Sequence, residues 1–303
     1  MLRKTMLALA DNDFVTRTVT SNRISRDLAF RFVAGETFDE SLASSKDLLN
    51  AGMMLTLDLL GENLSEPHLA EQAATEYCTM LDRIAETGAN STISVKLTML
   101  GLDISDEFAH DLMIRVLDRA RIHNNFVRID MEGSAYTQRT LDIFYALRET
   151  YGDTVGIVLQ SYLYRNDRDV EQAIERGAKV RLVKGAYAEP ETHAYPKKVD
   201  VDAAFRRQME RLMDDGNYPA IATQDDAIID VARGYAMRMG IDKSRFEFQM
   251  MYGIRENIQY QLVEAGYNMR VYVPFGEMWY PYFMRRMGER PANLMFALKN
   301  FVR

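Results

Sequence analysis

The stretch MMLTLDL at residues 53–59 is the first of eight short apolar runs that recur through the chain. Runs of this length, rich in aliphatic and β-branched residues, are typical of buried β-strands. The other seven runs are ISVKL (93–97), FVRIDM (126–131), VGIVLQ (155–160), KVRLV (179–183), PAIAT (219–223), FEFQM (246–250) and RVYVP (270–274). We therefore predict eight strands between residue 53 and the end of the chain.

Segments with helical periodicity separate these runs, so strand and helix alternate along the sequence. Ser65 followed by Pro67 indicates the start of one helix, and Gly88 indicates its end. Such alternation predicts a parallel sheet, because parallel neighbours need crossover connections. The clearest helical segments are 66–87, 106–121, 136–150, 199–215 and 255–266.

The length of the repeating part favours a closed sheet. Residues 53–303 comprise 251 residues, which matches the roughly 250 residues of a β/α barrel. We predict an α/β fold, a (β/α)8 TIM-type barrel over residues 51–303, with an open doubly wound sheet as the alternative. Residues 1–50 have no strand pattern and predict three short helices, broken near Asn22 and Gly35, that pack on the barrel. A transient membrane contact is the alternative reading of this segment.

Composition excludes several classes of protein. The net charge of −7 and the lack of a dense basic run argue against nucleic-acid binding. Cys78 is the only cysteine, so no intrachain disulfide forms, and the four histidines have no spacing that indicates a metal site. No apolar run approaches the roughly 18 residues that span a bilayer. We expect a cytoplasmic protein, attached at most to the inner face of the cell membrane.

Polar residues recur where the predicted strands end. Active sites of β/α barrels form at the carboxyl ends of the strands, and burying several charges there has a high free-energy cost. Lys96 and Asp130 could also be a purely structural ion pair. The recurrence of polar residues at the same end of the predicted sheet favours a polar ligand. The residues concerned are Glu62, Lys96, Asp130, Gln160, Arg181, Lys184, Thr223, Gln249 and Tyr272.

The segment WYPYFMRRMGER at residues 279–290 predicts a helix after the eighth strand. Tyr282, Arg285, Arg286 and Glu289 have the spacing i, i+3, i+4 and i+7, which places them on one helical face. Guanidinium groups match the geometry of a carboxylate, and a neighbouring tyrosine can cover an apolar body. The pattern predicts a site for a small acid, although a solvent-facing ion pair with Glu289 is the alternative.

Several motifs, in this order, resemble the proline dehydrogenase family in its monofunctional bacterial form. They are TLDLLGE (56–62), ISVKLT (93–98), RIDME (128–132), VLQSYLYR (158–165), RLVKGAY (181–187), EFQMMYG (247–253), RVYVPFG (270–276) and YFMRRMGERPAN (282–293). The resemblance implies a distorted β/α barrel that holds FAD. It also implies oxidation of L-proline to 1-pyrroline-5-carboxylate, with hydride passing to flavin N5 and electrons going on to a quinone or respiratory carrier.

The resemblance also implies roles for individual residues. Lys96, Arg285 and Arg286 would hold the proline carboxylate. Arg181 would stabilise the reduced flavin, and Asp130 would orient Tyr272 or Lys96. Glu62 and Arg285 would form a gate that closes the site. The side chains expected around the proline ring are Leu182, Tyr187, Tyr272 and Tyr282.

For the cofactor, the chain has no G-x-G-x-x-G motif after a strand, so only the resemblance points to FAD. The positions expected to contact it are Met131, Gln160, Arg181, Lys184, Gly185, Ala186, Thr223, Gln224, Gln249 and Glu289. Relatives usually have A-T-H-N where this chain has Ala222, Thr223, Gln224 and Asp225. This departure predicts weaker or altered FAD binding.

Two other classes of function compete with this interpretation. A lyase of the aldolase type would use Lys96 or Lys184 to form a Schiff base with a carbonyl substrate. A barrel-shaped binding protein would sense proline without oxidising it. Bleaching of a yellow protein by proline discriminates the dehydrogenase from both.

Overall fold

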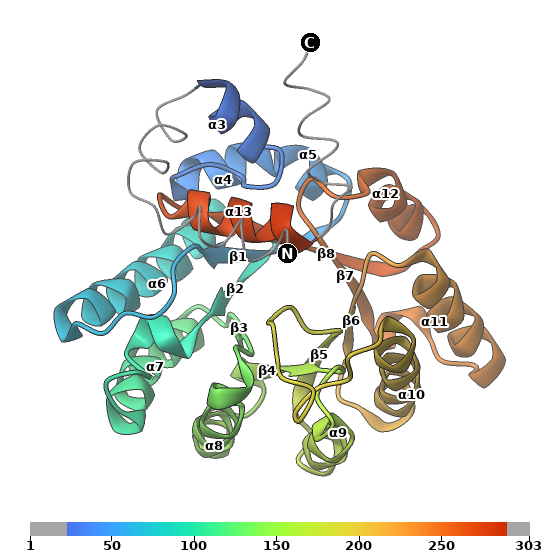
Figure 1. Ribbon diagram of the computed structural model, residues 1–303. Helices are drawn as coiled ribbons and strands as arrows, with labels where there is room; N and C mark the ends of the chain where they lie inside the picture. Colours follow the sequence, from blue (N-terminus) through green and yellow to red (C-terminus); the bar gives the residue numbers. More distant parts are fainter. Residues whose placement is uncertain (1–22, 290–303) are drawn as a thin grey trace.

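Eight parallel strands close into a barrel in the computed structural model, which describes the backbone of residues 23–289 and the side chains of residues 26–284. Each strand pairs with its neighbour in sequence, and β1 pairs with β8 (Figure 1). The predicted closed barrel is confirmed. The strands are Met54–Leu59 (β1), Ser91–Val95 (β2), Val127–Ile129 (β3), Val155–Gln160 (β4), Lys179–Val183 (β5), Ala220–Ala222 (β6), Glu247–Met251 (β7) and Asn268–Phe275 (β8).

Side chains alternate between the barrel interior and the surrounding helices. In β1, Leu55 and Leu57 are fully buried in the core cluster that the strands share with the helices. Thr56 instead bonds to Thr92 of β2, and Asp58 faces the central cavity. Strands buried on both faces are usually apolar throughout. Polar side chains at every second position therefore mark an interior built to carry charge.

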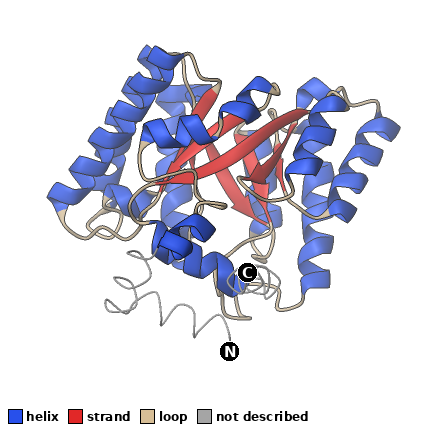
Figure 2. Ribbon diagram, turned by 90° about the horizontal axis from the view of Figure 1, so that it is seen from above, coloured by secondary structure: helices blue, strands red, loops and turns tan. Residues whose placement is uncertain are grey.

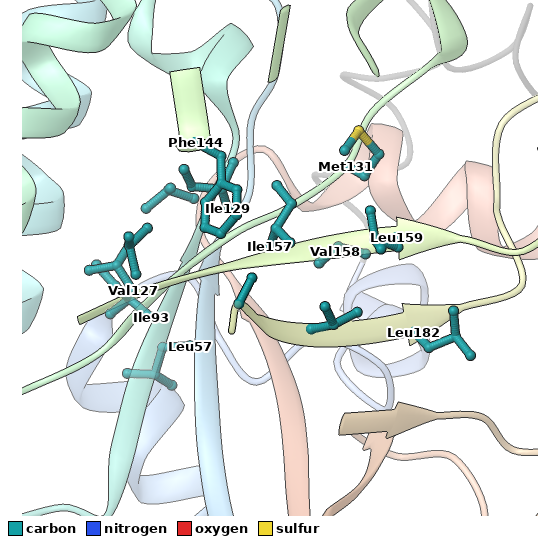
Figure 3. Packing of buried hydrophobic residues seen from close by; sticks show 14 of the residues in the cluster. Leu57, Ile93, Val127, Ile129, Met131, Phe144, Ile157, Val158, Leu159 and Leu182 are labelled. Atoms are coloured by element: carbon teal, nitrogen blue, oxygen red, sulfur yellow. The ribbon is translucent and has the colours of Figure 1, made fainter. Parts of the chain in front are cut away.

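Helices surround the barrel and cover the outer faces of the strands (Figures 1 and 2). Figure 3 shows Ile93, Ile129 and Ile157 of successive strands in one buried cluster with Phe144 of α8. The helices that follow the strands are Pro67–Thr87 (α6), Asp106–Ile122 (α7), Ser134–Tyr151 (α8), Asn166–Glu175 (α9), Lys198–Asp215 (α10), Asp226–Met239 (α11), Glu256–Glu264 (α12) and Trp279–Glu289 (α13), with short 3-10 turns at Leu97–Leu100 (η1), Gly152–Thr154 (η2) and Lys243–Arg245 (η3).

The two ends of α6 can be compared with the residues that predicted them, Ser65 with Pro67 and Gly88. Gly88 ends the helix in the left-handed conformation, with φ 65°, as predicted. The predicted start at Ser65 is wrong by one position, because Glu66 is the N-cap and Pro67 takes the first helical position. Proline fits there because its missing N–H has no helical partner at that position.

Short helices from the N-terminal segment pack on the barrel near its closure. They are Arg23–Ala29 (α3), Phe38–Ser44 (α4) and Lys46–Asn50 (α5), and the break around Gly35 is as predicted. The predicted break near Asn22 and the helix before it lie outside the described residues. Phe38 and Leu48 join the barrel core, while Phe32 of the α3–α4 connection packs with Phe283 of α13. Figure 1 shows α13 beside these helices, in front of β1 and β8.

Candidate active site

A cavity of about 600 Å³ opens at the carboxyl ends of the strands. This volume is within the range of roughly 300–1,000 Å³ typical of ligand and cofactor sites. Fifteen residues that the sequence singled out line it together. They are Glu62, Lys96, Asp130, Met131, Gln160, Arg181, Lys184, Gly185, Ala186, Tyr187, Thr223, Gln224, Gln249, Tyr272 and Tyr282.

Leu182 is the exception among the described residues that the sequence placed in the site. It is fully buried in the hydrophobic core and does not line the cavity. Arg181 and Val183, its neighbours in β5, both line the cavity, so strand alternation turns Leu182 toward the helices. Its expected contact with the proline ring stays a prediction. Arg285, Arg286 and Glu289 belong to α13, but their side chains lie outside the described residues.

Lys96 is held at the cavity by a carboxylate that the sequence interpretation missed. Its Nζ lies 2.6 Å from Asp58 Oδ1, and the two side chains are only 9% and 1% exposed. Burial alone would lower the pKa of Lys96, but attraction to Asp58 and Asp130 outweighs burial and raises it. Lys96 therefore stays protonated. Asp58 could have been found by the reasoning that found Lys96, since it is a lone charge in an apolar strand.

Asp130 does not pair with Lys96 but links two other side chains at the cavity floor. Its Oδ1 accepts from Arg181 Nη1 at 2.7 Å, and its Oδ2 accepts from the Tyr272 hydroxyl at 2.8 Å. Ser94 adds a bond to the same carboxylate at 3.1 Å. Burial, and then the negative charge of Asp130, raise the pKa of Tyr272, so its hydroxyl remains a donor. Of the two predicted partners, Asp130 thus contacts Tyr272.

Lys184 lies in a small charge network on another wall of the cavity. Its Nζ contacts Asp202 Oδ1 at 2.6 Å and Asp225 Oδ2 at 2.8 Å. Lys198 contacts the same two carboxylates. Bonding to Lys184 lowers the pKa of Asp225 to about 2. The negative charge that Asp225 brings to the A-T-Q-D segment is therefore balanced by lysines, which the sequence alone did not indicate.

Glu132 is a second carboxylate that the sequence interpretation missed. It is 3% exposed and accepts bonds from the backbone N–H of Thr98 at 3.2 Å and from its hydroxyl at 2.5 Å. Its backbone carbonyl accepts from Gln160 Nε2 at 2.8 Å, which links it to the cavity wall. Burial raises the pKa of Glu132 to about 7, well above its usual value of 4.5. Glu132 thus fixes the turn that follows Lys96.

Comparisons with known proteins give the family. A sequence model described as proline dehydrogenase matches residues 41–299. Proline dehydrogenase 2 of Bacillus subtilis is 40% identical over 301 residues, which are 99% of each chain. Proline dehydrogenase of Deinococcus radiodurans is 37% identical over 308 residues, covering the whole of this chain and 98% of the relative. The chain belongs to the proline dehydrogenase family. It is therefore an enzyme that oxidises proline in proline catabolism.

Solved structures of this family's relatives have the same fold. Proline utilization A of Bdellovibrio bacteriovorus, inactivated by N-propargylglycine, superimposes with a TM-score of 0.83 at 27% identity. The match covers 95% of this chain and 36% of that one, so the chain corresponds to about a third of that protein. Within the residues described for this proline dehydrogenase, no helix is long and apolar enough to cross a bilayer. That same part of the chain contains no cluster of His, Cys, Asp and Glu able to bind a metal ion.

The raised pKa of Glu132 makes the stability of this proline dehydrogenase depend on pH. Between pH 4.5 and 7, Glu132 is protonated in the folded chain and ionised in the unfolded chain. The free energy of unfolding therefore falls as pH rises through this window, by about 3 kcal/mol from this group. Above pH 7 the contribution is constant. In Glu132→Gln this loss does not occur, because the amide does not ionise.

Chemical denaturation of the parent and of Glu132→Gln at several pH values checks this expectation. The difference in free energy, variant minus parent, should increase by about 3 kcal/mol from pH 4.5 to 7. Glu189→Gln is the matched control, because Glu189 also accepts a hydrogen bond from a helix start, at Ser134, but is only partly buried. Parallel pH curves for the parent and Glu132→Gln would show that Glu132 titrates normally.

Proposed function

We propose that the chain is an FAD-dependent enzyme that oxidises L-proline to 1-pyrroline-5-carboxylate. The observation that carries this proposal is the cavity floor, where Arg181 is fixed by Asp130 beside the hydroxyl of Tyr272. A fixed guanidinium stabilises negative charge that develops on a neighbouring group. When bound, the flavin supplies the hydride acceptor that no protein side chain can provide.

The cavity walls fit a large, flat cofactor with a charged tail. Apolar side chains such as Met131, Val158 and Val183 alternate with polar groups around the cavity. At Gly185 the backbone has φ +111°, and a Cβ would lie 2.3 Å from the ring of Tyr162. Only glycine fits there, which leaves its peptide groups at the cavity surface. We assign the flavin contacts to Gln160, Lys184, Gly185, Ala186 and Thr223, with Met131, Gln224, Gln249 and Glu289 around them.

We assign proline to the part of the cavity that Lys96 and Tyr272 line. We assign its carboxylate to Lys96, Arg285 and Arg286, since three cations match one buried carboxylate. Tyr187, Tyr272 and Tyr282 cover the apolar ring, and Tyr272 is held in place by Asp130. This arrangement leaves the ring carbon beside the amine free to approach the cofactor. Positioning supplies most of the rate enhancement in this mechanism.

Closure of the site is assigned to Glu62 and Arg285. Glu62 lines the cavity at the end of β1, and α13 carries Pro281 and Tyr282 at the same opening. An ion pair across the opening would exclude water while proline is bound. The electrons then leave to a quinone or another respiratory carrier. A peripheral contact with the membrane surface would bring such a carrier to the opening.

The structure argues against the Schiff-base alternative. A lysine that attacks a carbonyl must lose its proton, which requires a lowered pKa. Attraction to Asp58 instead raises the pKa of Lys96, despite its burial. The Nζ of Lys184 is engaged by the carboxylates of Asp202 and Asp225, at 2.6 and 2.8 Å. Neither lysine is suited to nucleophilic attack.

An absorption spectrum before and after anaerobic addition of proline tests the proposed function. We expect the visible absorption bands of the flavin to bleach with proline and to recover with an acceptor dye. Borohydride should trap no substrate adduct on Lys96 or Lys184. A colourless protein that cannot be reconstituted with FAD would refute the proposal. A yellow protein that proline does not bleach would indicate a binding function without oxidation.

Gln224→His should bind FAD more tightly than the parent. Gln224 lines the cavity, and imidazole adds a stacking surface that an amide lacks. We expect the dissociation constant to fall by roughly 5- to 10-fold, which corresponds to about 1 kcal/mol. Titration of the apoenzyme with FAD, followed by flavin fluorescence, measures it. Gln261→His on the outer face of α12 is the control, and tighter binding by the parent than by Gln224→His would contradict the prediction.

A further inference from the structure

A continuous chain of buried polar side chains runs through the barrel beneath the cavity. Arg270 of β8 and Glu247 of β7 form a two-pronged ion pair, with Nε–Oε1 at 2.9 Å and Nη2–Oε2 at 3.1 Å. Glu247 also accepts a bond from Gln249 Nε2. Gln249 Oε1 in turn accepts from Arg181 Nε at 2.5 Å. The interiors of such barrels are usually filled by branched apolar side chains, so this chain of contacts calls for an explanation.

The direction of the Gln249 amide is fixed by the group below it. An ionised carboxylate only accepts hydrogen bonds, so Glu247 must face the amide NH₂. The amide oxygen then faces Arg181, whose guanidinium only donates. If the amide were reversed, NH₂ would face guanidinium and oxygen would face carboxylate. Both contacts would be repulsive in a low-dielectric interior.

Arg270 keeps this direction fixed because it keeps Glu247 ionised. Burial alone would raise the pKa of Glu247, but attraction to Arg270 outweighs burial and lowers it. Glu247 and Arg270 are 2% and 13% exposed as side chains, and neither is among the described residues that line the cavity. A buried ion pair contributes little net stability compared with apolar side chains of similar volume. Stability alone therefore does not explain why this pair occupies the interior.

We infer that Glu247 and Arg270 are positioning residues that hold Arg181 at the cavity floor through the amide of Gln249. The inference rests on the proposed function, since Arg181 is the group assigned to stabilise the reduced flavin. Asp130 accepts a bond from Nη1 of the Arg181 guanidinium at 2.7 Å, and Ser94 Oγ accepts from the same nitrogen at 3.1 Å. Gln249 holds Nε on the other side. Both contacts are needed to fix the plane and the depth of the guanidinium.

The test measures the reduction potential of the bound flavin in the holoenzyme. Glu247→Gln alone leaves Arg270 buried without its counter-charge, which lowers the stability of the fold. The pair variant Glu247→Met with Arg270→Met replaces both charges with apolar side chains and frees the Gln249 amide. We expect its potential to fall by about 30 mV, which is a tenfold weaker preference for the reduced form of a two-electron couple.

A double-mutant cycle separates positioning from general damage to the fold. Gln249→Leu should lower the potential by a similar amount. Combining it with the pair variant should add little, because all three substitutions break the same chain of hydrogen bonds. The control is Asp169→Asn, which breaks a partly buried ion pair between α9 and its N-cap residue Arg165, neither of which lines the cavity. Its potential should equal that of the parent.

The outcomes distinguish this inference from the proposed function. An unchanged potential in a yellow, proline-reducible pair variant overturns the inference and leaves the function intact. Additive shifts for the pair variant and Gln249→Leu also overturn it, because the pair then acts by another route. A parent protein that binds no flavin or is not bleached by proline overturns the proposed function itself.

Discussion

Replacing Arg285 and Arg286 together with Met should lower kcat/KM for proline by roughly three orders of magnitude. Each charge-assisted hydrogen bond to a carboxylate contributes about 1.5–3 kcal/mol, and each 1.4 kcal/mol is a factor of ten. Both arginines belong to α13, the helix whose Pro281 and Tyr282 line the cavity. We expect KM to rise more than kcat falls, because the lost contact binds the substrate before and during the reaction.

Steady-state kinetics with proline and an acceptor dye measure this effect, with flavin content determined for each variant. The matched control is Arg233→Met with Arg238→Met, which removes two exposed arginines from α11. The control should keep the parent kcat/KM. If the Arg285 and Arg286 variant turned over proline with unchanged kcat and KM, no arginine clamp would hold the carboxylate. The assignment of the substrate site would then be wrong.

Lys96→Met should impair both proline binding and folding. Loss of the third cation should raise KM for proline by roughly 100-fold, about 3 kcal/mol. The same change leaves Asp58 buried without its partner at 2.6 Å, which should lower the free energy of unfolding by roughly 3–5 kcal/mol. Two effects of one change need to be separated, because a poorly folded enzyme also binds proline poorly.

The double variant Asp58→Asn with Lys96→Met separates them. It removes the uncompensated charge, so chemical denaturation should show that most of the lost stability returns. Its KM for proline should stay high, since the cation is still missing. Recovery of both stability and KM would mean that Lys96 only neutralises Asp58 and does not contact the substrate.

The sequence predicted the strands well because each one is a local signal. The apolar runs 155–160 and 179–183 place β4 and β5 at their observed bounds of Val155–Gln160 and Lys179–Val183. The predicted runs 126–131 and 219–223 are longer than β3 and β6. Their last residues, Met131 and Thr223, lie beyond the ends of these strands and line the cavity. Strand pairing, which is a non-local property, sets those ends.

The sequence also predicted that most of these polar side chains lie close together, because all parallel strands of a barrel end at one face. It did not predict which charges pair. Lys96 was considered as a partner of Asp130, yet it binds Asp58, and Asp130 binds Arg181 and Tyr272. Leu182 was assigned to the cavity from a motif, although its place next to Arg181 in an alternating strand turns it outward.

The eight strands, the family and the kind of side chain at each strand end could be predicted from the amino-acid sequence alone. These depend on local periodicity and on motifs that lie within a few residues of one another. The contacts between neighbouring strands, such as Asp58 with Lys96 and Glu247 with Arg270, became clear only from the folded barrel. Those contacts join residues 38 and 23 positions apart. They depend on the register and closure of the whole barrel, which no single segment specifies.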